Sequence, residues 1–110
     1  MKRNEAWKSI PNYKYYKVSS LGRVKSLPRV VRSRGGYRTI KERILKSSLS
    51  SSGYLNLSLS ENGKIKVFLV HQLVAMAFLN HKQSKFKLVI NHKNFNKLDN
   101  RLKNIEIVTN

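Results

Sequence analysis

The spacing of hydrophobic and polar positions along the chain predicts mostly short β-strands. Between Trp7 and Leu27, aromatic and β-branched residues alternate with polar ones, and the run Ser19–Gly22 interrupts them as a turn. Residues 29–46 alternate basic and apolar side chains around two glycines. This pattern suits either an exposed basic strand pair or a mobile loop, and both interpretations stay open.

The clearest hairpin lies in the middle of the chain and leads into a helix. Residues 54–59 alternate, residues 61–64 supply an Asn-Gly turn, and residues 65–70 return apolar. The polar run before it, Ser47–Ser52, is expected to be a loop. From residue 70 the apolar positions follow a helical period, which predicts a helix that packs on the hairpin. These positions are Val70, Leu73, Val74, Ala77 and Phe78.

The last third of the chain predicts two further strands. A basic loop over residues 80–87 precedes the apolar run Leu88–Ile90, and a polar run over residues 91–104 precedes the apolar run Ile105–Val108. The whole pattern predicts an α+β fold with several short antiparallel strands and one central helix.

Charge indicates the class of partner. The 110 residues are enough for one compact domain, and their 23 Lys and Arg against five acids give a net charge of +18. Nucleic acid is the leading partner for such a surface, because each phosphate that it neutralises releases a counterion. A membrane partner is not expected, because the sequence shows no long amphipathic helix and no apolar anchor. We expect a soluble, cytoplasmic protein.

Composition also excludes several kinds of chemistry. The chain has no cysteine, which removes disulfides, thiol nucleophiles and Cys-ligated zinc. Its five acids are scattered, whereas a glycosidase or a two-metal phosphodiesterase needs grouped carboxylates. Catalysis would therefore depend on histidine and neutral oxygen ligands, with at most one metal ion.

One of the three histidines stands out as a candidate for catalysis. His71 begins the predicted helix and suits a capping or hydrogen-bonded core residue. His81 lies in the basic loop and suits either a phosphate contact or a solvated side chain. His92 follows an apolar strand, has Asn91 before it and opens an asparagine-rich run. Side-chain amides can both ligate a hard cation and orient an imidazole.

Two blocks of the sequence resemble a known family. The first, AWKSIPNYKYYKVSSLGRVKSL over residues 6–27, resembles the NUMOD4 motif of phage and intron-encoded HNH homing endonucleases. The second, from Val70 to Thr109, is similar to the HNH core of that family and includes VINHKNFNKLDNRLKNIEIVT. The resemblance implies a NUMOD4-like DNA-binding segment over residues 1–46 and an HNH-like module over residues 47–110, within one compact domain.

The resemblance also implies roles for individual residues in phosphodiester hydrolysis. His92 would be the general base, Asn104 would hydrogen bond to the His92 ring, and Asn91 would bind Mg²⁺ or another divalent cation. The chain departs from the family in the loop after His92, where Lys93–Asn96 lack the usual carboxylate and turn glycine.

A second departure concerns the ββα-metal (His-Me finger) unit. The family has a helix after the strand equivalent to Ile105–Val108, and the sequence ends at Asn110, so the unit is expected to be incomplete. Three explanations are open: a cleavage-dead relative, a natural chain that continues, or a ligand supplied by another chain.

Basic residues among aromatic and glycine residues are candidates for holding DNA, either along the phosphates or as a β-ribbon in the major groove. They are Arg23, Lys25, Arg29, Arg32, Arg34 and Arg38. Any one of them could instead merely solubilise the surface.

Three functions are consistent with these observations. The main prediction is a DNA-binding protein of the HNH homing endonuclease type, whether or not it cleaves. An active Mg²⁺-dependent nuclease or nickase is the first alternative. A basic phage inhibitor that occupies another protein's nucleic-acid channel or guide RNA is the second. RNA as the nucleic acid and the oligomeric state are left open.

Overall fold

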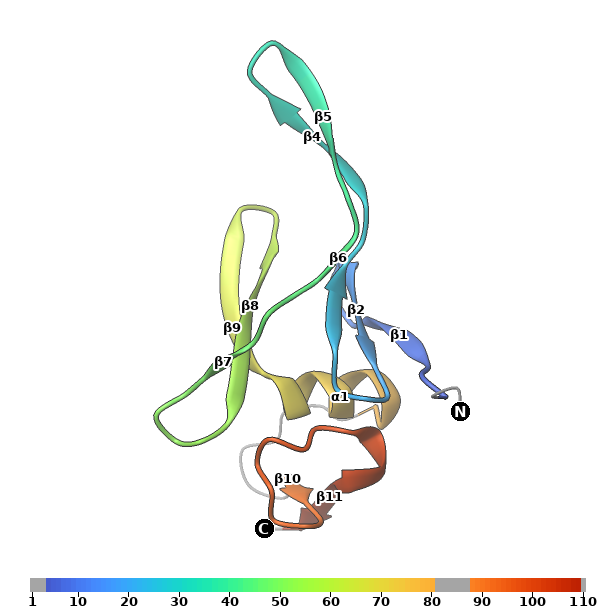
Figure 1. Cartoon of the computed structure of the whole chain (residues 1–110), viewed down its shortest axis with the longest axis vertical. Helices are drawn as coiled ribbons and strands as arrows, with labels where there is room; N and C mark the ends of the chain where they lie inside the picture. Colours follow the sequence, from blue (N-terminus) through green and yellow to red (C-terminus); the bar gives the residue numbers. More distant parts are fainter. Residues whose placement is uncertain (1–3, 81–87, 110) are drawn as a thin grey trace.

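The computed structural model describes residues 4–80 and 88–109 and has the predicted α+β composition. Figure 1 shows two hairpin arms on one side of a short central helix and a small hairpin on the other. The elements in chain order are β1 (Trp7–Ile10), β2 (Tyr13–Ser19), β3 (Val24–Ser26), β4 (Arg29–Ser33), β5 (Gly36–Ile40), β6 (Arg43–Ile44), β7 (Ser48–Leu49), β8 (Leu55–Glu61), β9 (Lys64–Leu69), α1 (Val70–Phe78), β10 (Leu88–His92), the 3-10 helix η1 (Leu102–Asn104) and β11 (Ile105–Thr109).

The N-terminal strands form an antiparallel sheet in the order β1-β2-β3-β6. Alternation places Tyr16, Val18 and Val24 in the core, as the sequence pattern predicts. The Ser19–Gly22 turn joins β2 to β3, and the buried Ser19 hydroxyl accepts hydrogen bonds from the backbone N–H groups of Leu21 and Arg23, both at 3.1 Å. The turn is therefore fixed by its own side chain.

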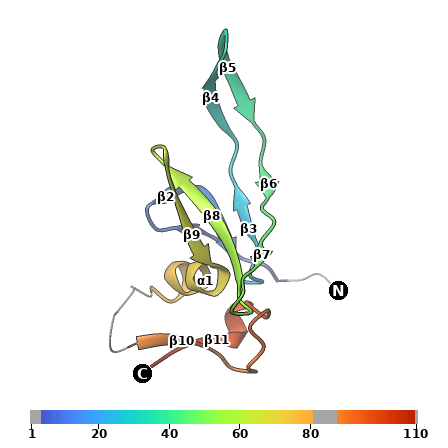
Figure 2. The same ribbon diagram turned by 90° about the vertical axis from the view of Figure 1, so that its left-hand side faces the viewer.

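Strands β4 and β5 form one arm and settle the open interpretation of residues 29–46 in favour of a strand pair. The arm projects well beyond the rest of the molecule (Figures 1 and 2). The radius of gyration is accordingly 15.2 Å, whereas a compact chain of this length has about 13 Å.

The second arm is the β8–β9 hairpin, which is extended by β7 into a three-stranded sheet. Its turn has Asn62 at φ 54° and Gly63 at φ 78°, the left-handed pair that an Asn-Gly hairpin turn requires. The expectation of a loop over Ser47–Ser52 was wrong in part, because Ser48 and Leu49 pair with β8. A polar run can join a sheet edge through backbone hydrogen bonds alone, which periodicity does not reveal.

Helix α1 holds the core together. It begins where the helical period begins, and the Gln72 amide oxygen accepts a hydrogen bond from the Leu69 N–H at 3.1 Å, which satisfies one donor at the helix start. Its buried face packs on residues that precede the helix and on residues that follow it in the sequence. The core contains Ile10, Tyr16, Val18, Val24, Leu57, Leu59, Phe68, Val70, Leu73, Val74, Ala75 and Ile105.

Strands β10 and β11 are the two expected strands of the ββα-metal unit and lie below α1 in Figure 1. Strand β10 extends to His92, two residues beyond the predicted end at Ile90. The basic loop that contains His81 lies outside the described residues. Within residues 4–80 and 88–109, no helix is long and apolar enough to cross a membrane.

Candidate nuclease site and nucleic-acid interface

The β10–β11 hairpin places Asn91 and His92 on opposite faces, because neighbouring residues in a strand alternate. His92 pairs with Ile105 and faces the core, where the two residues are only 6% and 3% exposed. Asn91 pairs with Glu106 on the other, more open face. The candidate base and the candidate metal ligand therefore point to different sides of the same hairpin.

A buried amide fixes the His92 ring. His92 Nε2 and Asn100 Oδ1 lie 2.8 Å apart, and Asn100 is itself only 5% exposed. An amide oxygen can only accept, so Nε2–H donates and the lone pair of the neutral ring is on Nδ1. This tautomer is the one in which Nδ1 can take a proton.

The expected contact between Asn104 and the His92 ring was wrong. Asn104 Oδ1 accepts from the Asn94 N–H at 3.0 Å, and Asn104 Nδ2 donates to the Asp99 carbonyl at 2.8 Å. Asn104 thus holds the backbone next to Asn100, and its carbonyl also accepts from the N–H of Lys93, directly after His92, at 2.8 Å. The path of the loop decides which asparagine reaches the ring, and sequence spacing does not define that path.

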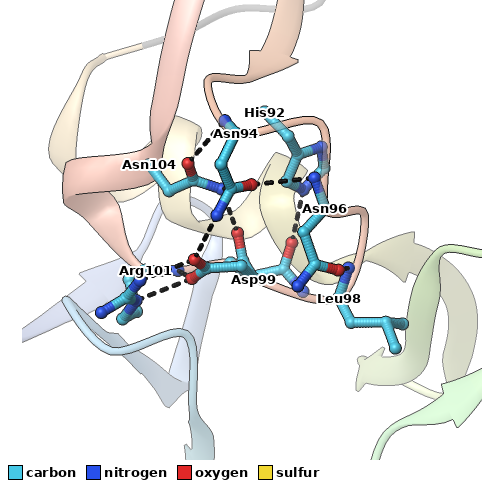
Figure 3. A network of polar contacts seen from close by, with 8 residues as sticks. His92, Asn94, Asn96, Leu98, Asp99, Arg101 and Asn104 are labelled. Atoms are coloured by element: carbon cyan, nitrogen blue, oxygen red, sulfur yellow. Dashed lines mark hydrogen bonds and ion pairs between the residues drawn. The ribbon is translucent and has the colours of Figure 1, made fainter.

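The loop between β10 and η1 is held by a network of side chains (Figure 3). Asn94 Nδ2 donates to Asp99 Oδ2 at 2.9 Å, and the Arg101 guanidinium donates to both Asp99 carboxylate oxygens at 2.7 Å. These hydrogen bonds from Arg101 hold the pKa of Asp99 well below its usual range. Asp99 is therefore an ionised structural residue that fixes the segment next to Asn100.

Phe95 takes the position where the resemblance expects a turn glycine. It keeps a left-handed backbone with φ 63° and its side chain is 87% exposed. A non-glycine residue in this region carries strain, which the loop tolerates because the Phe95 N–H donates to the His92 carbonyl at 3.0 Å. The turn therefore forms with Phe95 in the position where the family has a glycine.

His71 is buried in the core, as expected, but its Nδ1 has no hydrogen-bond partner among the described residues, and it is also a neighbour of His92. The two ring centroids lie 4.8 Å apart in an edge-to-face arrangement, and Tyr54 contacts both rings. Burial, and to a lesser extent the nearby His92, lowers the pKa of His71 to about 4. His71 is therefore neutral at physiological pH, and nothing in its sequence position indicated that it lies beside His92.

Asn91 and Glu106 together offer oxygen ligands for a cation. Asn91 Nδ2 donates to Glu106 Oε1 at 2.9 Å, which turns the amide oxygen of Asn91 away from that contact. Mg²⁺ is commonly held by one or two protein oxygens, with the rest supplied by water and substrate phosphate. The pair fits this requirement, although the described residues contain no group of three or more His, Cys, Asp or Glu around one point.

The six basic candidates fall into two groups. Arg32, Arg34 and Arg38 are exposed on the β4–β5 arm, and Arg29 lies at its base over the Tyr15 ring at 5.0 Å. Their charge faces solvent on a projecting ribbon.

Arg23 and Lys25 have partners within the protein. Arg23 pairs with Glu5, and Lys25 Nζ lies 3.7 Å from Glu42 and 4.2 Å from the centroid of the Trp7 ring. These two residues contribute to packing, which leaves the arm as the stronger candidate for contact with phosphates.

Several known proteins are similar to this chain in sequence. The NUMOD4 motif matches residues 5–60, which continues past the boundary expected at residue 46. The uncharacterized HNH endonuclease L245 of Acanthamoeba polyphaga mimivirus is 39% identical over 91% of this chain. The DNA endonuclease I-HmuI of Bacillus phage SP01 is 36% identical over 94% of it.

A solved structure agrees with the sequence relatives. The structure titled "DNA binding and cleavage by the HNH homing endonuclease I-HmuI" matches 94% of this chain with a TM-score of 0.72 and 34% identity. The chain spans 26% of the mimivirus relative and 52% of I-HmuI. Because the NUMOD4 motif covers residues 5–60, the chain belongs to the NUMOD4 family, and the proteins that it resembles in sequence and in fold are HNH endonucleases.

Proposed function

We propose that the chain binds double-stranded DNA, with the β4–β5 arm as its main contact. The projecting ribbon carries this proposal. Its exposed arginines lie on both faces, since Arg32 pairs across the strands with Tyr37 on one face and Arg38 pairs with Val31 on the other. A two-stranded ribbon fits the major groove of B-DNA, where arginines reach phosphates and guanine edges.

The apolar exposure of the arm supports the same proposal. Tyr37 is 75% exposed and Val30 is 65% exposed on the face that carries Arg32. An isolated two-stranded hairpin is only marginally stable in water, and this one has no core of its own. A partner that covers apolar and cationic groups together would stabilise it, and the groove of DNA presents both kinds of surface.

A second function, cleavage of a phosphodiester bond, is favoured by the His92–Asn100 hydrogen bond. With Nε2–H held by Asn100, His92 presents Nδ1 as a base for water. Asn91 and Glu106 would hold a divalent cation through their oxygens. When bound, the cation would polarise a phosphate that lies on the face of the hairpin opposite to the His92 ring. The relatives support these two functions and give no support to an inhibitor.

One plasmid assay separates binding from cleavage. Supercoiled plasmid is incubated with the chain in Mg²⁺, in Mn²⁺ and in EDTA, beside His92→Ala, and a mobility-shift assay is run on the same samples. Conversion to open-circle or linear DNA that requires the cation and His92 supports both functions. A shift without conversion supports binding alone, and the absence of any shift at low salt overturns the proposal.

A further inference from the structure

We propose that the Ser19–Gly22 turn of the N-terminal sheet is a positioning element for His92. It acts through Asn100, whose backbone it holds. The inference rests on the proposed role of His92 as the base, but the contacts that support it are independent of DNA. It gives the N-terminal segment a role in the chemistry besides binding.

The first contact is a close approach that only glycine permits. A Cβ atom added at Gly22 would lie 2.9 Å from the Asn100 carbonyl oxygen and 3.0 Å from the Asn100 Cβ. Real Cβ atoms are not found this close to backbone atoms. Gly22 also has φ +83°, which favours glycine for a second reason.

The second contact is a hydrogen bond that ties the loop to the same turn. The Leu102 N–H donates to the Ser20 carbonyl at 2.7 Å, two residues beyond Asn100. On the other side of the turn, the Ser20 N–H donates to the Ala6 carbonyl at 2.8 Å. The turn is thus anchored to the residue directly before β1 and presents a fixed surface to the loop.

The contacts with the Ser19–Gly22 turn restrain Asn100 on one side, and the hydrogen bonds within the loop between β10 and η1 restrain it on the other. The Asp99 carbonyl, directly before Asn100, accepts from Asn104 Nδ2 at 2.8 Å. The Asn100 amide oxygen then has little freedom of position against His92 Nε2. A displacement of the Asn100 backbone would lengthen that hydrogen bond and release the ring.

The test compares two glycine substitutions that strain the backbone equally. Gly22→Ala introduces the clash with Asn100, whereas Gly63→Ala has φ +78° with nothing within 4 Å of the added Cβ. Exchange of the His92 Nε2–H proton with water is measured by NMR on the isolated chain, without DNA or cation, with His92→Ala used for assignment. We expect exchange about tenfold faster or more in Gly22→Ala, the scale of losing one hydrogen bond, and no change in Gly63→Ala.

A second variant keeps the proposal testable if Gly22→Ala does not fold. Ser19→Ala removes the hydroxyl that fixes the turn and adds no atom near Asn100, and it should also accelerate exchange at His92. On plasmid, a variant that folds should lose cleavage rate. The proposal is overturned if the folded turn variants leave the exchange of His92 Nε2–H as slow as in Gly63→Ala. Because this readout needs no DNA, its failure is distinct from failure of the proposed nuclease function.

Discussion

Removing the charge of the β4–β5 arm should reduce both the affinity for DNA and its dependence on salt. The perturbation is the triple substitution of Arg32, Arg34 and Arg38 by Ala. All three side chains are exposed, so the fold should be unaffected. Among the described residues, they are also the three basic candidates that form no ion pair and no ring contact.

The size of the effect follows from counterion release. Each phosphate neutralised on B-DNA contributes about −0.9 to the slope of log affinity against log salt, so three contacts contribute about −2.7. Between about 50 and about 200 mM salt, the affinity of the unaltered chain should therefore fall about 40-fold more than that of the variant.

The assay is a fluorescence anisotropy titration of duplex DNA at a series of KCl concentrations. The control variant replaces Lys8, Lys14 and Lys103 by Ala, which removes the same net charge from exposed positions outside the arm. If both variants lose the same slope, or if the arm variant loses none, the arm is not the phosphate-binding element and the reasoning is refuted.

Three further predictions concern the candidate site. Replacing His71 by Gln should flatten the pH dependence of stability. The folded-state pKa of His71, about 4, lies below the ordinary value of 6.5, so the unfolded chain binds the proton first as the pH decreases. The free energy of unfolding therefore falls between pH 6.5 and pH 4, by up to about 1.4 kcal/mol per pH unit. Urea unfolding at several pH values measures this, and an unchanged slope would show that His71 is not the group responsible. Glu106→Gln should weaken Mn²⁺ binding to the DNA-free chain by about fivefold or more, because a charged oxygen is lost beside Asn91, whereas the control Glu42→Gln should not. Calorimetry or the EPR signal of free Mn²⁺ measures the affinity, and equal affinities of the two variants would show that Glu106 does not bind the cation. Phe95→Gly should raise the free energy of unfolding by up to about 1 kcal/mol, because it relieves a left-handed backbone whose side chain makes little contact; a lower melting temperature would contradict the assignment of strain.

Local sequence patterns were sufficient to predict much of the fold. The Asn-Gly turn after residue 60 and the change of period at Val70 predicted the β8–β9 hairpin and α1, and the structure confirms both. These features depend on backbone preferences and on alternation within a few residues, so the sequence carries them directly. The family resemblance was confirmed in the same way, because its motifs are contiguous.

Other features depended on what lies nearby in space. Residues 29–46 supported two interpretations because an exposed ribbon has no core-facing side to give it a clear period. His71 and His92 are 21 positions apart in sequence, and only the packing of α1 on β10 brings their rings together.

In the candidate site, some features were determined by the sequence and others only by the tertiary structure. The sequence by itself determined that His92 follows an apolar strand and is followed by asparagines able to orient it. Only the tertiary structure decided that Asn100, not Asn104, reaches the ring, and that Gly22 holds Asn100 in place. The physical reason is that a hydrogen bond between side chains requires positions accurate to a few tenths of an ångström. In this loop that accuracy comes from contacts with a turn about 80 residues away in the chain, which local sequence preferences cannot specify.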